Sequence, residues 1–244
     1  MLSILLLCGI GYAHAQDAYE RKLRFGLKAG VNGSLFTKTV EPFGPEQSGR
    51  LDYFNRFFRI SGFGGLTVDA AVSKRLSVGV EALYNARGMA YREKNNHVIL
   101  YDSEGNERQA FNDFNYNIDY IEFPLTLNYN FSDTEARTFI AGYAGVAPAL
   151  AVHAITKMSY AESVDGSGRR ARNERANLNE VNHFNNSLLL GLKVGDNNPR
   201  KTSVFGDFRM SYTLLPVFKK DEALSKNNLR TEMLTFSLGL GFKF

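Results

Sequence analysis

Charged side chains in this sequence recur on the polar side of alternating segments, and the chemistry that they offer first is pairing with one another. Eight residues form this set, namely Lys28, Arg59, Asp69, Glu81, Glu122, Lys193, Asp207 and Arg209. If they share a narrow interior, opposite charges must pair, because an unpaired charge away from bulk water is costly. Structural pairing is the simpler interpretation, and a gated path for ions is the alternative. The sequence does not assign the partners, because the tilt and stagger of the strands are unknown.

Patterns of residues that could support catalysis or metal binding are scarce. His97, His153 and His183 stand singly without metal-ligand spacing, which favours positions at a surface or rim. The sequence contains no Gly-x-Ser-x-Gly elbow, no phosphate loop and no dinucleotide fingerprint. Because small membrane barrels can be enzymes, Asp113, Asp119 and His153 stay candidates by position alone. We therefore predict a non-enzymatic protein with no metal and no cofactor.

The overall composition excludes a disordered chain and a helical membrane protein. Of the 244 residues, 44% are hydrophobic, 13% aromatic and 22% charged, and the formal net charge is +4. Basic and acidic residues are interleaved along the chain. The one basic cluster, Arg169 to Arg175, lies among Gly, Ser, Asn and Glu, which is typical of a solvated loop. No nucleic-acid partner is therefore expected.

The N-terminal residues are predicted to be an export signal. Residues 1–15 form a short apolar run that ends in Ala13-His14-Ala15, a small-x-small cleavage pattern. Cleavage before Gln16 would leave one domain over residues 16–244, with no apolar run long enough to form a transmembrane helix. Cys8, the single cysteine, would leave with the signal, so the mature chain would have no disulfide. Residues 5–8 resemble a lipoprotein box only weakly, because no small residue precedes the cysteine.

Eight segments alternate between apolar and polar residues with the period of a β-strand. They cover approximately residues 23–37, 57–71, 76–90, 114–131, 138–157, 184–194, 202–218 and 231–244. The last segment is the clearest, since every even position from Leu234 to Phe244 is apolar and the odd positions are small or polar. The two faces of the fifth segment are hard to tell apart because it is rich in small residues.

Short and long connections alternate strictly between these segments. Residues 72–75, 132–137 and 195–201 form short turns, whereas residues 38–56, 91–113, 158–183 and 219–230 form longer polar loops. This order places all long loops on one side and both termini with the short turns. A transmembrane barrel has this asymmetry. A soluble eight-stranded barrel of the lipocalin type is the main rival.

The residue types on the two faces separate these alternatives. A lipocalin-like barrel would carry frequent charges on its outer face, but the polar face here is mostly Gly, Ser, Thr and Asn. Aromatic residues gather near strand ends, as in the two interfacial girdles of a membrane barrel. The turn-side set is Phe25, Phe131, Phe139, Phe242 and Phe244, and the loop-side set is Phe36, Phe57, Phe58, Tyr84, Tyr116 and Tyr212. We predict an all-β fold, an eight-stranded antiparallel up-and-down transmembrane β-barrel, with ten strands as the open alternative.

One motif resembles a known family. The segment Tyr120-Ile-Glu-Phe-Pro-Leu-Thr-Leu-Asn-Tyr129 is similar to the Tyr-[Leu/Ile]-Glu-[Ile/Phe]-Pro-Leu signature of the PorT-like outer-membrane β-barrel family of Bacteroidota. Phe25-Gly-Leu-Lys-Ala-Gly-Val-Asn32 and the Phe244 ending extend the resemblance over nearly the whole mature chain. The resemblance implies an eight-stranded barrel in the bacterial outer membrane, and the short turns beside both termini predict that the termini are periplasmic. The founding member is associated with type IX secretion, but most relatives have no assigned role.

These observations predict an integral outer-membrane protein that acts as an accessory or interaction component. It would be surrounded by outer-membrane lipid, and its long outer loops or its lipid-facing wall would contact another envelope protein. A soluble periplasmic ligand-binding barrel and a narrow channel are the alternatives. Phe244, in phase with Phe242 and Leu240, resembles the signal that the barrel-insertion machinery recognises.

Pro124 interrupts the fourth segment, because proline cannot donate a hydrogen bond to a strand ladder. In a barrel without edges it marks either a β-bulge that re-aims Glu122 into the interior or a tolerated irregularity.

Overall fold

The computed structural model describes residues 23–40, 55–133, 136–160, 174–196, 202–220 and 226–244, so the predicted signal lies outside the described residues. The regular elements are β1 (Leu23–Phe36), β2 (Asn55–Phe57), β3 (Arg59–Ala71), β4 (Leu76–Tyr101), β5 (Glu107–Glu122), β6 (Leu125–Asn130), β7 (Thr138–Ser159), β8 (Glu174–Asn177), β9 (Phe184–Asp196), β10 (Ser203–Thr213), α2 (Lys226–Leu229) and β11 (Met233–Lys243). Within these ranges, no helix has the length and apolar character needed to cross a bilayer.

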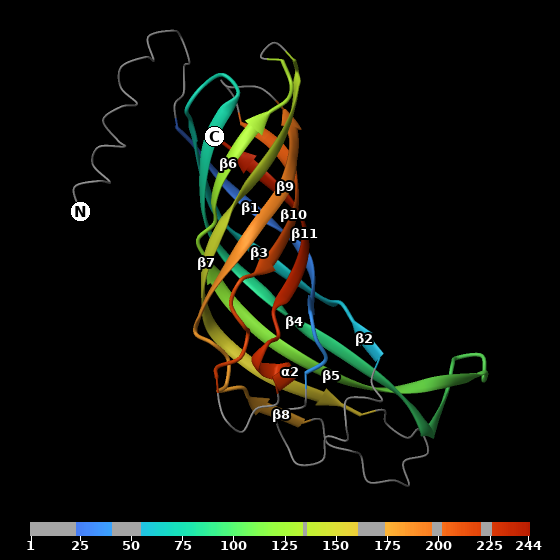
Figure 1. Ribbon diagram of the computed structural model, residues 1–244. Coiled ribbons are helices and arrows are strands. Elements are labelled where there is room, and N and C mark those ends of the chain that lie inside the picture. Colours follow the sequence, from blue (N-terminus) through green and yellow to red (C-terminus); the bar gives the residue numbers. More distant parts are fainter. Residues whose placement is uncertain (1–22, 41–54, 134–135, 161–173, 197–201, 221–225) are drawn as a thin grey trace.

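The strands close into an antiparallel barrel in which each strand pairs with its neighbours in the chain (Figure 1). The circuit runs β1, β3, β4, β5 with β6, β7, β9, β10 and β11, and the β1–β11 pairing closes it. Counting β5 and β6 as one interrupted strand gives eight barrel strands, which confirms the predicted fold class. The short strands β2 and β8 are additions that pair with β4 and β7 outside this circuit.

The barrel is apolar outside and charged inside, the reverse of a soluble barrel. On β11, the outward side chains of Leu238, Leu240 and Phe242 are 61%, 65% and 51% exposed. The inward side chains of Lys28 and Glu81, on β1 and β4, are each 3% exposed. Such a wall suits lipid around it and polar groups within it, and it gives the soluble alternative no support.

Pro124 does not create a β-bulge, so that interpretation was wrong. Leu83 of β4 pairs with Glu122, and Val80 of β4 pairs with Leu125. The two pairs are three residues apart on both strands, so no extra residue is inserted at the proline. The Pro124 carbonyl still accepts the Glu81 N–H at 2.9 Å. Because alternation continues through the proline, Glu122 faces the interior without any re-aiming. Pro124 is therefore a tolerated irregularity.

The connection predicted as a long loop over residues 91–113 is mostly strand. β4 continues to Tyr101 and β5 begins at Glu107, so the two strands form a hairpin that extends beyond the barrel (Figure 1, lower right). At its tip, Asp102 Oδ1 accepts the backbone N–H groups of Asn106 and Glu104, each at 2.9 Å. These bonds, with that from Asn106 the stronger influence, hold the pKa of Asp102 below its usual range.

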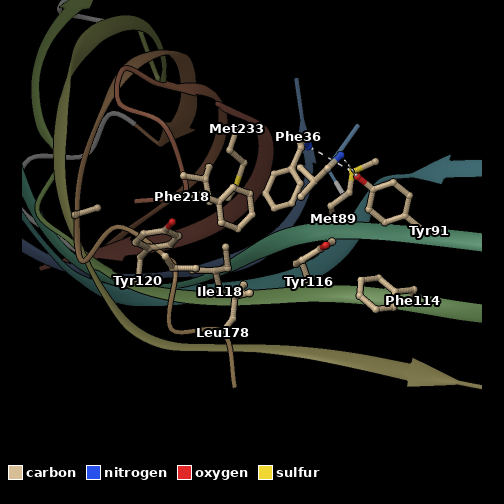
Figure 2. Close-up of a cluster of buried hydrophobic side chains, with 14 of the residues drawn as sticks. Phe36, Met89, Tyr91, Phe114, Tyr116, Ile118, Tyr120, Leu178, Phe218 and Met233 are labelled. Atoms are coloured by element: carbon tan, nitrogen blue, oxygen red, sulfur yellow. Dashed lines mark hydrogen bonds between the residues drawn. The ribbon is translucent and has the colours of Figure 1, made fainter. Parts of the chain in front are cut away.

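The loop-side end of the barrel is filled by an apolar cluster, which we call the loop-side core (Figure 2). It comprises Phe36, Val40, Met89, Tyr91, Phe114, Tyr116, Ile118, Tyr120, Ala149, Met158, Leu178, Val181, Val217, Phe218 and Met233. Its centre is Tyr116, whose ring centroid lies 5.1 Å from that of Phe114 and 5.5 Å from that of Phe36. The rings of Tyr91 and Phe218 contact Tyr116 from the other sides, at 6.1 and 6.2 Å. These contacts close the interior on the loop side.

Three of the predicted girdle residues face the interior instead. Phe36 and Tyr116 are fully buried in the loop-side core, and the ring of Phe139 lies 5.6 Å from Lys243 Nζ inside the barrel. The reason is alternation, since Phe36 shares its phase with Ser34, and Tyr116 shares its phase with Glu122. The other predicted girdle residues are outward and between 39% and 59% exposed, namely Phe25, Phe57, Phe58, Phe131, Phe242, Phe244, Tyr84 and Tyr212.

Inward aromatic rings lie close to glycines near the β1–β11 seam. A Cβ at Gly30 of β1 would lie 2.8 Å from Phe63 Cε1, and one at Gly239 of β11 would lie 2.7 Å from Phe63 Cζ. The Phe63 ring, which belongs to β3, therefore spans both seam strands. A Cβ at Gly241 would overlap the Phe205 ring in the same way. Glycine is required at these positions because a side chain approaches the backbone so closely.

Phe244 should matter for assembly in cells rather than for the stability of the finished barrel. Its side chain is 54% exposed, while its N–H donates to the Phe25 carbonyl at 2.9 Å. Deleting Phe244 should lower the amount inserted in cells severalfold, whereas the yield of refolding into detergent should stay nearly unchanged. Quantitative blots of membranes and refolding yields measure the two effects.

The matched control for this deletion is Phe25→Ala. Phe25 is an outward aromatic of the turn side with 53% exposure, but it does not end the chain. This variant should leave insertion in cells unchanged. If deletion of Phe244 lowered insertion in cells and refolding in detergent equally, the residue would only pack against lipid.

Candidate functional site: the charged lumen

Glu81 is the centre of an ion-pair network in the turn-side half of the interior, which we call the lumen network. Lys28 Nζ donates to its two carboxylate oxygens at 3.0 and 2.8 Å. Arg209 Nη2 donates to the same two oxygens at 2.9 and 2.8 Å. The three residues come from β4, β1 and β10, which alternation turns toward a common axis. All three are buried, so each charge depends on its partners rather than on water.

Asp207 joins the same network through a different set of donors. Lys28 Nζ donates to its Oδ2 at 2.8 Å, and the Tyr143 hydroxyl donates to its Oδ1 at 2.7 Å. The Tyr143 oxygen in turn accepts a hydrogen bond from Arg209 Nε at 2.9 Å. The phenol of β7 therefore connects a carboxylate and a guanidinium of β10 and satisfies both of them.

Asp69 forms the part of the lumen network nearest the turns. Its Oδ2 lies 2.7 Å from Lys243 Nζ, and its Oδ1 lies 3.8 Å from Lys193 Nζ. The Lys243 ammonium also stands over the rings of Phe205 and Phe139, at 4.8 and 5.6 Å from the centroids. Such cation–π contacts stabilise a buried ammonium that has few carboxylate neighbours.

A second, smaller group lies between the lumen network and the loop-side core. Arg87 Nη2 pairs with Glu122 Oε1 at 2.7 Å, and Asn85 donates to Glu122 Oε2 at 3.0 Å. Asn32 then donates to Asn85 Oδ1 at 2.7 Å. Polar contacts thus continue along the interior wall until the apolar side chains of the loop-side core begin.

The structure brings six of the eight sequence-predicted residues into the lumen network, namely Lys28, Asp69, Glu81, Lys193, Asp207 and Arg209. Glu122 belongs to the second group. Arg59 lies toward the loop side, where its Nε donates to Asn117 Oδ1 at 2.6 Å and its Nη1 donates to the Arg87 carbonyl at 3.1 Å.

The sequence analysis did not identify Tyr143 and Lys243 of the lumen network or Arg87 of the second group. Arg87 and Lys243 stand in the inward phase of their strands, so the alternation that identified the other residues could have found them. Tyr143 lies on β7, where Ala and Gly occupy both faces and hide the phase.

Of the three catalytic candidates, only Asp119 and His153 lie opposite each other in the ladder, and Asp113 is apart from both. Asp113 and Asp119 are six residues apart on β5, roughly 20 Å along a strand. Asp113 is paired with Arg92 at 2.7 Å, whereas His153 pairs in register with Asp119 and lies 3.5 Å from Arg175. Within the described part of the chain, no group of three or more His, Cys, Asp or Glu residues is placed to hold a metal ion. The charged side chains of the interior pair with one another and hold one another in position.

The filled interior predicts that the unmodified protein forms no steady pore of porin size. About eight strands enclose a space that side chains can fill, and here the lumen network and the loop-side core occupy successive levels of it. Recordings from purified protein in planar bilayers should show no stable large conductance. A reproducible open-pore current would contradict the filled interior.

Comparison with known proteins agrees with this architecture. The family model described as outer membrane protein beta-barrel domain matches residues 14–219. No curated protein matches the chain significantly.

Several solved structures are similar over most of their length. The outer membrane protease OmpT from Escherichia coli is 11% identical, with 95% of this chain and 99% of that chain covered and a TM-score of 0.45. The N-terminal β-barrel domain of OprF from Pseudomonas aeruginosa is 8% identical, with 90% and 97% covered and a TM-score of 0.35. The attachment invasion locus protein Ail of Yersinia pestis is 12% identical, with 92% and 100% covered and a TM-score of 0.35. Since the family model spans most of the sequence, the chain belongs to the outer membrane protein beta-barrel domain family.

Proposed function

We propose that this protein is a non-enzymatic outer-membrane barrel that serves as an interaction component, and that the β4–β5 hairpin is its docking element. The observation that carries the proposal is the hairpin itself, which extends beyond the barrel while the interior is closed (Figure 1). A closed barrel offers other proteins its loops and its wall rather than a passage.

The outer half of the hairpin has strand edges that no described residue covers. β5 pairs with β7 only from Asp113 onward, so residues 107–112 pair with β4 alone. On the opposite edge, β2 reaches β4 only as far as Arg92. Uncovered N–H and C=O groups can pair with an added strand from another chain.

Exposed apolar side chains accompany these free edges. Ile99 and Tyr101 on β4 are 53% and 55% exposed, and Phe111 on β5 is 37% exposed. An added strand would gain backbone hydrogen bonds from the edge and apolar contact from these side chains. The partner that fits is therefore an envelope protein with an extended segment.

The orientation and the pathway form part of the same proposal. Leu23 and Phe244 both lie at the end of the short turns, which supports periplasmic termini and an outer hairpin. Membership of the PorT-like group of Bacteroidota is supported by the Tyr120–Tyr129 motif, in which Tyr120 and Glu122 are both buried inward. That resemblance makes a component of type IX secretion the first partner to look for.

Shortening the hairpin should abolish partner binding without disturbing the barrel. Replacing residues 96–109 by Asn-Gly would join Asn95 to Ala110, which are opposite each other in the ladder, through a two-residue turn. The variant should insert normally, but the amount of partner protein that co-purifies with it after mild detergent extraction should fall at least tenfold. Photo-crosslinking from position 101 should capture the same protein, and its identity tests the link to type IX secretion.

The matched crosslinking control is position 25, where Phe25 faces outward at the turn side with 53% exposure. It should capture lipid and not the partner. Retention of the partner by the shortened variant would refute docking through the hairpin.

A further inference from the structure

The turn-side end of the interior contains a cavity of about 130 Å³ with a strongly basic lining, which we call the basic cavity. Among the described residues that line it, the cations are Arg24, Lys74, Arg75, Lys193 and Lys243, whereas the only acid is Asp69. Lys193 and Lys243 form its inner wall and are 3% and 8% exposed. The cavity is distinct from the docking hairpin, which lies at the opposite end of the barrel.

Lys193 has unused capacity to donate hydrogen bonds. An ammonium group has three donors, but among the described residues Lys193 Nζ makes one hydrogen bond, to Asn128 Oδ1 at 3.2 Å, and otherwise stands 5.0 Å from the centroid of the Tyr143 ring. The nearest carboxylate oxygens belong to Asp69 and Glu81, at 3.8 and 3.9 Å. A group this deeply buried is normally satisfied by polar partners. A ligand in the basic cavity would supply them.

The balance of charge points the same way. Among the described residues, the lumen network joins the four cations Lys28, Lys193, Arg209 and Lys243 to the three carboxylates Asp69, Glu81 and Asp207. Lys28 and Arg209 hold the Glu81 oxygens at 2.8 to 3.0 Å, so the excess positive charge falls on the cavity side of the network. A buried charge without a counter-ion is unfavourable, and an anion in the cavity would balance it.

We propose that the basic cavity binds a phosphate-class oxyanion that enters from the turn side. Lys193 and Lys243 would donate to it from within, and the guanidinium groups of Arg24 and Arg75 would face it from the mouth. A phosphate group has several oxygens that can accept from such convergent donors. The volume holds several waters or one small oxyanion. Free phosphate and a phospholipid headgroup both present this chemistry.

Thermal unfolding of the refolded full-length protein tests the proposal. A ligand that binds only the folded state raises the unfolding midpoint with a saturable dependence on its concentration. Inorganic phosphate should produce such a rise in zwitterionic detergent at constant ionic strength, and chloride should not. Lys193→Met should weaken the apparent affinity at least tenfold, whereas Lys157→Met, at an exposed position of β7, should not change it.

Two further variants keep the test decisive if Lys193→Met fails to fold. The rim double variant Lys74→Gln/Arg75→Gln changes only exposed positions and should weaken phosphate binding severalfold. Asp69→Asn removes the only acid of the described lining and should tighten binding severalfold. Opposite responses of this kind are not expected from a general effect of salt on the barrel.

Short-chain phosphatidic acid, added below its micelle concentration, separates the two sources of phosphate. Saturation by inorganic phosphate alone identifies a free anion, and saturation by the lipid at lower concentration identifies a headgroup. The proposal is overturned if neither probe gives a saturable rise, if chloride gives the same rise, or if the response is unchanged in both the Lys193 and rim variants.

Discussion

Replacing Glu81 with alanine should lower the free energy of unfolding of the barrel by about 3–5 kcal/mol. Glu81 accepts four hydrogen bonds from Lys28 and Arg209, and all three residues are almost completely buried. Removing the carboxylate leaves two cations facing each other in a space that water reaches poorly. Urea-induced unfolding in detergent, followed by circular dichroism, measures the loss.

Arg209→Ala leaves the buried Glu81 and Asp207 carboxylates to share Lys28 and should destabilise the barrel by a similar amount. The matched control is Glu104→Ala at the exposed tip of the hairpin, which should change stability by no more than about 0.5 kcal/mol. In the double variant Glu81→Ala/Arg209→Ala, the two losses should not add, because each single change already breaks the shared contact. Additive losses, or a loss for Glu81→Ala as small as that of the control, would show that the network does not stabilise the fold.

The second large effect is expected from Tyr116→Ala, which should destabilise the barrel by about 3–5 kcal/mol. Its ring is fully buried and contacts the rings of Phe36, Tyr91, Phe114 and Phe218. The remaining side chains cannot collapse fully into the vacated space, because they are held by β1, β4, β5 and the segment after β10 (Figure 2). The same urea titration measures the change.

Tyr101→Ala is the control for this substitution, since Tyr101 is 55% exposed on the hairpin and contributes nothing to the loop-side core. Tyr116→Ala should also leave the bilayer conductance unchanged, because the lumen network still fills the other half of the interior. A destabilisation below about 1 kcal/mol would show that Tyr116 is not central to the packing of the loop-side core. A new stable conductance would show that the lumen network does not close the barrel by itself.

Alternation predicted the fold and many of the inward charged residues, because successive side chains of a strand must point to opposite faces. It identified β11 from Leu234 to Phe244 and assigned Lys28 and Asp207 to the interior from their own strands. It could not show that these two residues touch, since they are 179 positions apart. Their contact depends on the stagger around the closed barrel, which no local pattern records.

The errors arose where phase was ignored or absent. Phe36 and Tyr116 were assigned to a girdle from their place near strand ends, although their phase already pointed inward. The hairpin resembles a loop in the sequence because residues 91–113 are mostly polar, and its register shifts between Asn95 and Ile99. Tyr143 was missed because small residues occupy both faces of β7.

The Phe63 ring that spans Gly30 and Gly239 has a consequence for the fidelity of barrel closure. β1 and β11 lie at opposite ends of the chain, so their pairing is the least local in the fold and the most open to error. A slip of one residue would turn the leucines of β11 inward. A slip of two residues would bring either Ser237 or Gly241 under Phe63, and the surface of Gly241 is already covered by the Phe205 ring. A slip of two residues in either direction therefore produces a steric clash. Only the native register gives the rings of Phe63 and Phe205 separate glycines to lie against.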